Sequence, residues 1–403
     1  YHSYVYLWSS SSISIISFFL MVIARGWLVL EMTDSAFLVT ATQAASMLPQ
    51  LFTSLIGGFL ADRFNRKKII IFAELFNMST LLALSVLVIT DVVQVWQIFV
   101  LSFMGGITFS IGFLARTSSV PNLVERNDIT SAVALFTTVF SAGQLIGPAI
   151  AGILIESLGM GITFLSSALV LIVALLVLVP LKTISGNTSD TGARRLSFIQ
   201  SVAEGFSYVK KSNLVLGLMV LGLGATLFGF PFMSILPVFA RDVLDVGANG
   251  LGWLAAMQGV GALIGSIIVA SMRSHYQVKL LTVVGSLGLP VFVLLFALSS
   301  AYALSLALVL ILGFFFQVFM TSNFTQVQII VPDSIRGRVL SIRMIIFGVG
   351  PIGMIALGTA AEIIGAVDAT AAMGVIGFVF LSITIALFPT LRKTESKQNQ
   401  ITS

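Results

Sequence analysis

The chain has 403 residues, of which 57% are hydrophobic and 9% are charged, and its mean hydropathy is +1.07. Soluble proteins carry roughly a quarter charged residues, so this composition excludes an ordinary water-soluble protein. There is no Cys, which excludes thiol catalysis and Cys-ligated metals, and His2 and His275 are too far apart to form a metal-binding motif.

Runs of about 20 apolar residues are long enough to cross a bilayer as helices. The sequence contains twelve such runs, at residues 6–29, 36–60, 68–90, 96–120, 130–157, 162–181, 213–237, 250–272, 279–299, 302–328, 339–363 and 368–390. We expect no cleaved signal, and because the chain opens at Tyr1 rather than Met we expect N-terminal residues to be missing. The sequence therefore predicts an all-α membrane protein with twelve transmembrane helices.

The longest connector, residues 182–212, divides these runs into two sets of six. Its first half is polar, and its second half has a weak amphipathic pattern that predicts a helix on the membrane surface. A shift of 211 residues aligns three places in the two sets: Asp34 with Asp245, Lys68 with Lys279, and Pro121 with Pro332. We therefore predict two pseudo-symmetric six-helix bundles, with these boundaries: an N-terminal bundle at 1–181, a cytoplasmic linker at 182–212, a C-terminal bundle at 213–391 and a cytoplasmic tail at 392–403.

The basic residues are distributed unevenly between the two faces of the predicted membrane domain. Seventeen of the 21 Lys and Arg residues fall on the face that carries both termini and the linker. The positive-inside rule places that face in the cytoplasm, here of a bacterial cell with the protein in its plasma membrane. The basic charge is thus explained by topology, and nucleic-acid binding is excluded.

One connector concentrates charge in a tight turn, "GGFLADRFNRKK" at residues 57–68. Its notable residues are Gly58, Asp62, Arg63, Arg66 and Lys67. Glycine permits close approach of the end of helix 2 to another helix, and the Asp62 carboxylate suits the electropositive start of helix 11. Arg343 in helix 11 would add an ion pair to this contact, which we expect to latch the two halves together. The three basic residues are equally well explained by topology alone.

Helix 5 carries a second pattern of small residues, "GQLIGPAIAG", with Gly143, Gly147, Pro148 and Gly152. Helix 11 has a similar stretch, "GVGPIGMIALG", and helix 8 contains "GVGALIGS". Small residues allow close helix packing and Pro bends a helix, so these stretches predict a seam on which the halves pivot. Ordinary small-residue packing is the alternative.

These motifs resemble those of a known transporter superfamily. The turn pattern G-x-L-A-D-R-x-x-R-K resembles the loop 2–3 signature of the major facilitator superfamily, and the helix 5 pattern resembles the motif of its exporting branches. The pieces "NLVERNDITSA" and "PDSIRGRVLSI" are similar to the macrolide-efflux and enterobactin-exporter group. The resemblance implies alternating access with proton antiport. Ser102 stands where many drug antiporters carry an Arg in helix 4, so their usual coupling arrangement is not reproduced.

Charged residues within the predicted spans are few. Arg25 is expected at the outer interface, and four residues are candidates for ion coupling: Glu74, Arg116, Glu156 and Glu362. An acid inside the membrane indicates function by default, although Glu74 has a structural alternative in pairing with Arg116 or a basic residue of the turn.

The centre of the membrane domain is predicted to be uncharged. Neutral polar and aromatic side chains in the spans are the candidates for a substrate cavity: Gln43, Asn77, Gln144, Phe228, Phe232, Gln258, Gln317 and Asn323. Such a lining suits a large apolar or amphiphilic compound.

We predict a secondary transporter that exports amphiphilic or hydrophobic small molecules of drug or siderophore type. No nucleophile–base set, metal cluster or ATP-binding loop is recognisable in the sequence, so neither an enzyme nor an ATP-driven pump is expected. We expect H⁺ as the coupling ion, membrane lipid as the surroundings, a monomer, and no cofactor. A lipid or lysolipid flippase, a non-transporting receptor and an uptake symporter are the alternatives.

Overall fold

A computed structural model describes residues 2–53, 65–125, 128–181, 198–272 and 274–392, and within these ranges the regular elements are helical. The N-terminal half contains α1 (His2–Thr33), α2 (Ala36–Met47), α4 (Arg66–Ile89), α5 (Val95–Ser119), η1 (Val120–Asn122) and α6 (Ile129–Leu178). After α7 (Phe198–Lys211), the C-terminal half contains α8 (Asn213–Gly224), η3 (Ala225–Gly229), α9 (Phe232–Val238), η4 (Phe239–Val243), α10 (Gly247–Ser271), α11 (His275–Ala297), α12 (Tyr302–Ile330), α13 (Asp333–Phe347), α14 (Gly350–Ile364), α15 (Ala366–Leu387) and η5 (Pro389–Leu391).

Ten of the described segments are long and apolar enough to span a membrane. One of them, Ser131–Leu178, has 48 residues and is broken at Gly159, so it forms two spans. The predicted run 36–60 begins with α2 and is described only to residue 53. The protein is therefore an all-α membrane protein of twelve transmembrane helices in two six-helix bundles, as the sequence predicted.

Two pairs of backbone positions show that the halves are built alike. Asp34 and Asp245, which the 211-residue shift aligns, both adopt a left-handed backbone with φ of 51°. Gly159 and Gly365 end helices 5 and 11 with φ of 79° and 88°, a conformation that favours glycine. The same residue type thus adopts the same left-handed backbone conformation at corresponding turns of the two halves.

Two of the predicted spans are interrupted near proline residues. The span Asn213–Val243 is divided into α8, a π-helical turn η3, α9 and a second π-helical turn η4, with Pro231 and Pro237 in and around α9. Helix 11 is divided into α13 and α14 at Gly348 and Val349, just before Pro351. It begins at Asp333, six residues earlier than predicted, because residues 333–338 form its first turns despite their charge.

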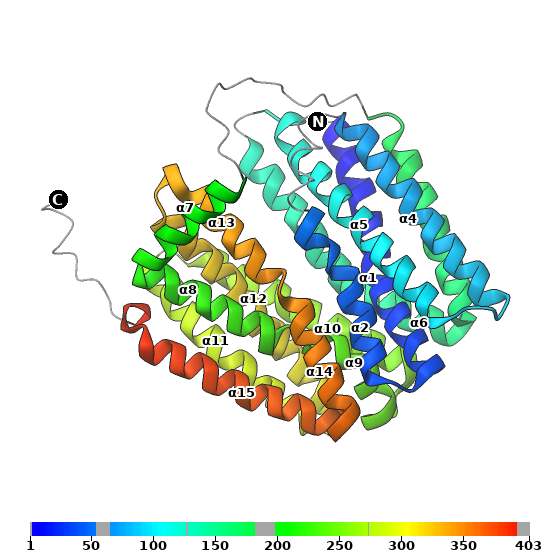
Figure 1. The fold of residues 1–403 in the computed structure, drawn as a ribbon. Coiled ribbons are helices and arrows are strands. Elements are labelled where there is room, and N and C mark those ends of the chain that lie inside the picture. The colour runs from blue at the N-terminus through cyan, green and yellow to red at the C-terminus, as the bar shows by residue number, and fades with distance from the viewer. Residues whose placement is uncertain (1, 54–64, 126–127, 182–197, 273, 393–403) are drawn as a thin grey trace, which may run out of the picture.

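The two bundles meet at one end and separate toward the other (Figure 1). We call the face that carries Leu181 and Phe198, at the two ends of the undescribed stretch 182–197, the linker face. The face that carries Asp34 and Arg241 is the distal face. The helices α2, α9, α10 and α14 come together near the distal face, whereas α7 and α13 lie away from α5 at the linker face.

The helix α7 lies in the predicted linker and packs on the C-terminal bundle. A Cβ on Gly205 would lie 2.9 Å from the Arg338 carbonyl oxygen of α13, so the two helices are in close contact. Glu204 forms an ion pair with Arg338 across the same contact. Val209 is buried, whereas Phe206 is exposed. Apolar residues of α7 therefore lie both on the side that packs on the bundle and on an exposed side of the helix.

Candidate transport site and gates

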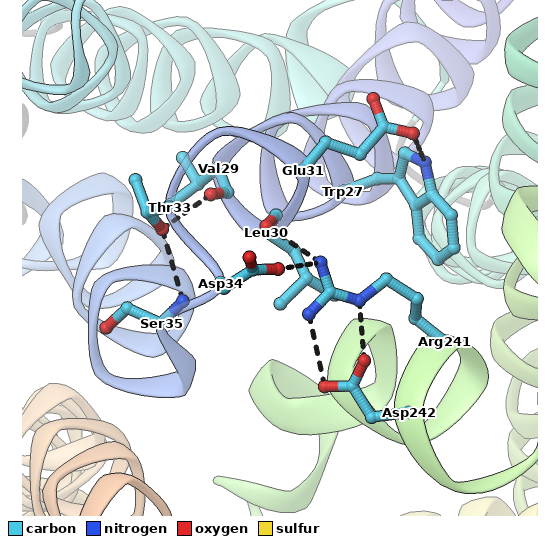
Figure 2. Close-up of polar contacts among 9 residues, drawn as sticks. All are labelled: Trp27, Val29, Leu30, Glu31, Thr33, Asp34, Ser35, Arg241 and Asp242. Atoms are coloured by element: carbon cyan, nitrogen blue, oxygen red, sulfur yellow. Dashed lines mark hydrogen bonds and ion pairs between the residues drawn. The ribbon is translucent and has the colours of Figure 1, made fainter.

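Arg241 connects the two halves at the distal face (Figure 2). Its Nη1 lies 2.6 Å from Asp34 Oδ1 and donates a 3.0 Å hydrogen bond to the carbonyl oxygen of Leu30, in the last turn of α1. Its Nε lies 2.6 Å from Oδ1 of Asp242, which fixes the guanidinium from its own side. A cation at a helix C-terminus is favourable because it neutralises unpaired carbonyl groups. The C-terminal half therefore caps α1 of the N-terminal half.

Glu362 makes the complementary contact at the start of the next helix. Its Oε2 accepts hydrogen bonds from the Ser35 hydroxyl at 3.0 Å and from the Phe37 amide at 3.2 Å. These donors lie at the N-terminus of α2, where an anion is favourable. A cation and an anion of the C-terminal half thus cap adjacent helix ends of the N-terminal half. Sequence reasoning missed both contacts, although an Arg on the face poor in basic residues was a usable signal for Arg241.

Replacing Arg241 with Gln is expected to open the distal face more often. An exposed ion pair and a helix-end contact each stabilise a structure by about 1 kcal/mol or less. The equilibrium between the closed and the open distal face should therefore shift roughly fivefold toward the open state. The chain has no Cys, so Thr40→Cys, buried beside Gly358, reports opening through its rate of maleimide labelling. Arg336→Gln is the matched control because its ion pair with Asp333 lies within one half. Equal labelling of all three proteins would contradict the role of Arg241.

Glycines form a close seam between the first part of α6, which is the predicted helix 5, and α10, which is the predicted helix 8. A Cβ on Gly152 would lie 2.7 Å from the Ala248 carbonyl oxygen, and one on Gly252 would lie 2.6 Å from that of Pro148. Farther from the distal face, a Cβ on Gly259 would lie 2.8 Å from the amide nitrogen of Leu145. Backbone atoms of the two halves are therefore in direct contact along α6 and α10.

The seam only partly matches the predicted "GVGALIGS" stretch. Gly259 faces helix 5 as expected, but Gly261 and Gly265 pack on α12 of their own half. Gly252, which belongs to the closest part of the seam, precedes that stretch. Closely spaced glycines point to different sides of a helix. Their spacing alone therefore did not identify the glycine that contacts the other half.

The other small residues predicted for the seam are divided between two roles. A Cβ on Gly143 would lie 2.5 Å from Ile15 Cγ2, and one on Gly147 would lie 2.8 Å from the Ile16 carbonyl oxygen, so both pack on α1 within one half. In helix 11, Gly358 packs directly on Thr40 of α2 and so joins the two halves.

The charged turn is described only in part. Gly58, Asp62 and Arg63 lie outside the described residues. Arg66 Nη1 donates to the Ser118 carbonyl oxygen at 2.6 Å, and Lys67 Nζ donates to that of Leu181 at 2.6 Å. Both basic residues therefore make contacts at the linker face within the N-terminal half.

Arg343 contacts α12 of its own bundle. Its Nη2 donates to the Met320 carbonyl oxygen at 3.2 Å, its Nε lies 3.4 Å from Asn323 Oδ1, and its guanidinium lies 4.7 Å from the centre of the Phe324 ring. These neutral partners hold the side chain within the C-terminal half in this conformation.

Glu74 and Arg116 form a buried ion pair in the N-terminal bundle. Their side chains are 4% and 5% exposed, and Arg116 Nη2 contacts Glu74 Oε1 directly. The Ser14 hydroxyl donates to the same carboxylate oxygen at 2.5 Å. Of the two roles considered for Glu74, pairing with Arg116 is therefore observed. The other carboxylate oxygen, Oε2, has no hydrogen-bond partner among the described residues.

The other two coupling candidates lie toward the distal face. Glu156 is exposed, and Glu362 is exposed and engaged with the start of α2. Neither side chain is buried inside a bundle.

Three of the predicted cavity residues come together where the halves meet. Gln43 Nε2 lies 3.4 Å from the Ser234 carbonyl oxygen, and Gln258 Nε2 lies 3.0 Å from Met233 Sδ. A Cβ on Gly259 would lie 2.9 Å from the carbonyl carbon of Gln144. Gln43 and Gln258 thus contact adjacent residues of α9, and the backbone of Gln144 packs on α10 beside Gln258.

The remaining cavity candidates are dispersed. Phe232 is fully buried and packs on Phe296, and Asn323 Nδ2 donates to the Leu218 carbonyl oxygen at 2.9 Å. Asn77, Phe228 and Gln317 are half-buried.

Arg25 is buried among the helices of the N-terminal bundle. It was expected at the outer interface, but it is only 7% exposed. The helix α1 continues to Thr33, so Arg25 lies eight residues, or about 12 Å, inside its distal end. The predicted span ended too early because the sequence pattern does not define helix ends to within a turn.

The fold is that of a membrane transporter. The structure matches the crystal structure of a mutant of the nucleoside transporter NupG with a TM-score of 0.76 and 14% sequence identity, covering 97% of this chain and 100% of that one. It matches a mutant of the peptide transporter POT with a TM-score of 0.77 and 12% identity, covering 96% and 94% of the two chains. At these identities the likeness establishes the fold.

Sequence comparison defines the family within this class. Residues 2–403 match the model of the transmembrane secretion effector family, and the chain belongs to this family of the major facilitator superfamily. It is 26% identical to the multidrug efflux pump Tap of Mycolicibacterium fortuitum, over 93% of this chain and 92% of that one. It is 23% identical to the staphyloferrin A transporter of Staphylococcus aureus (92% of each chain) and 26% identical to the enterobactin exporter EntS of Shigella boydii (81% and 77%). It is a multi-pass protein of the bacterial plasma membrane.

Proposed function

We propose that the protein exports amphiphilic or hydrophobic small molecules as a secondary active transporter that works by alternating access. The observation that carries this proposal is the closure of the distal face, where Arg241, Glu362 and the Gly152–Gly252 seam join the two halves. Contacts that can open and re-form between two bundles are what alternating access requires. The drug and siderophore relatives support export of small organic compounds.

The orientation of the cycle follows from the distribution of basic residues. With most Lys and Arg on the linker face, that face is cytoplasmic and the distal face is external. The described conformation then faces inward, ready to receive a compound from the cytoplasm or the inner leaflet. Opening the distal contacts would release that compound outside.

We propose H⁺ as the coupling ion and Glu74 as its carrier. The Oε2 atom of Glu74 has no hydrogen-bond partner among the described residues, so in the proposed cycle it would take up the proton without breaking a hydrogen bond to them. Protonation would weaken the attraction between Glu74 and Arg116, because a neutral carboxyl group binds an arginine less strongly. The pair would then provide the link between proton movement and rearrangement of the N-terminal bundle.

Asp62 is proposed to latch the linker face in the alternate, outward-facing state. In the described conformation Arg338 is paired with Glu204 and Arg343 with α12, so both have partners within their own half. Asp62→Asn should therefore lower the efflux rate severalfold or more, with normal amounts of protein in the membrane. Efflux at the wild-type rate would refute the latch.

Efflux from cells tests the proposed function directly. Bacteria that lack their own multidrug pumps would be loaded with a fluorescent amphiphilic drug, or separately with a siderophore, and efflux followed with and without a protonophore. Protonophore-sensitive efflux above that of cells with an empty vector is expected. Efflux that a protonophore leaves unchanged would refute proton coupling, and no efflux by well-inserted protein would refute export of the tested compounds.

A further inference from the structure

Arg25 is a buried cation for which the structure provides no carboxylate. It is 7% exposed, and no acidic side chain among the described residues lies within ion-pair distance of it. Its Nε has no hydrogen-bond partner in the same part of the chain. Arg116, buried to a similar degree in the same bundle, is paired with Glu74. Of the two buried arginines in the described part of this bundle, Arg116 has a carboxylate partner among the described residues and Arg25 has none.

An unmatched arginine inside a membrane is costly, since its charge has lost water and gained no counter-charge. Such residues are rare and face the interior of a bundle, where they mark the paths of substrates and ions. None of the described residues supplies the counter-charge, which points to an anion that binds from outside the protein.

The surroundings of Arg25 leave room for the guanidinium and offer a further donor. A Cβ on Gly105 would lie 3.2 Å from Nη2 and 3.4 Å from Nη1, so the bare backbone of α5 makes space for the group. Ser102 lies three residues earlier, on the same face of α5, and its fully buried hydroxyl also lacks a hydrogen-bond partner among the described residues. Two unsatisfied donors, one charged, thus belong to the same part of the bundle.

The site also lies beside the meeting point of the two halves. A Cβ on Gly26, the next residue along α1, would lie 3.1 Å from Gln43 Nε2 and 3.2 Å from Pro237 Cγ of the C-terminal half. Gln43 also contacts Ser234 of α9, so Arg25 lies next to a contact between the two bundles.

We propose that Arg25 binds a carboxylate of the transported compound, so that the preferred substrates are amphiphilic organic anions. This inference rests on the proposed export function and names its substrate class. The guanidinium matches a carboxylate in shape and charge and can bind both of its oxygens at once. The apolar residues around it would hold the rest of the compound.

Binding to the purified full-length protein in detergent tests this assignment. The probes are dansyl-labelled aminoundecanoic acid and its primary amide, which share an apolar body and differ in charge. Energy transfer from tryptophan, including Trp27 two residues from Arg25, reports binding. The wild type should bind the acid at least tenfold more tightly than the amide, and Arg25→Met should bind the two equally. Arg336→Gln, which alters an arginine at the linker face, should keep the full preference.

A second variant distinguishes the loss of the guanidinium group from misfolding of Arg25→Met. Arg25→Lys keeps the charge but loses the planar guanidinium group that can bind both carboxylate oxygens. It should therefore retain a reduced preference for the acid. Equal binding of acid and amide by the wild type, or an undiminished preference in Arg25→Met or Arg25→Lys, would overturn the proposal. The assay requires no transport, so a clear preference in a protein that shows no efflux would refute export and leave the role of Arg25 standing.

Discussion

Gly152→Ala is expected to reduce efflux close to the level of cells without the protein. The added Cβ would lie 2.7 Å from the Ala248 carbonyl oxygen and 3.0 Å from the Cα atoms of Asn249 and Gly252. Backbone atoms cannot rotate away as side chains do, so the two halves must separate. Overpacking of this kind costs about 1–3 kcal/mol, which corresponds to a roughly 5- to 150-fold bias against closure of the distal face.

The efflux rate and the labelling of Thr40→Cys measure this effect together. Slow efflux with fast labelling is expected, because the variant should remain open at the distal face. Gly222→Ala is the matched control, since a Cβ there meets only Ile346 Cγ2 at 3.9 Å. Wild-type efflux by Gly152→Ala would show that the seam is not needed for closure.

Glu74→Gln is expected to destabilise the protein by about 3–5 kcal/mol and to abolish proton-coupled efflux. Breaking a buried ion pair leaves the remaining charge without compensation, which costs more than the pair itself contributes. Removing Arg116 as well, as Met, should restore part of the stability but not transport. Unfolding of the purified variants in detergent measures the change in the free energy of unfolding.

Glu204→Gln provides the comparison for this prediction. Its ion pair with Arg338 is partly exposed, so its loss should cost no more than about 1 kcal/mol. If Glu74→Gln and Arg116→Met destabilise independently and their effects add, the two side chains are not coupled and the proposed role of the pair fails.

The sequence predicted those features that depend on length and composition. A bilayer needs about 20 apolar residues for each span, so the twelve runs identified the fold even though their ends were wrong by several residues. Small residues also pointed to the seam at Gly152, because they let the backbones of two membrane helices approach closely.

Features that depend on how helices rotate and meet were not predictable in this way. The burial of Arg25 follows from where α1 ends and which side faces α5, and neither is encoded in hydropathy. The contacts of Arg241 and Glu362 join residues more than 200 and more than 300 positions apart, respectively. Such pairs are fixed by the packing of the two halves, for which a single sequence contains no local signal.

The one-residue joints at Gly159 and Gly365 have a mechanical consequence. Helix 5 passes to helix 6, and helix 11 to helix 12, with no loop between them to absorb a change in angle. When the seam tilts helix 5, helix 6 must travel with it, and the same holds for helices 11 and 12. Two of the six helices of each half are thus joined end to end, so movement at the seam is expected to shift helices 6 and 12 as well.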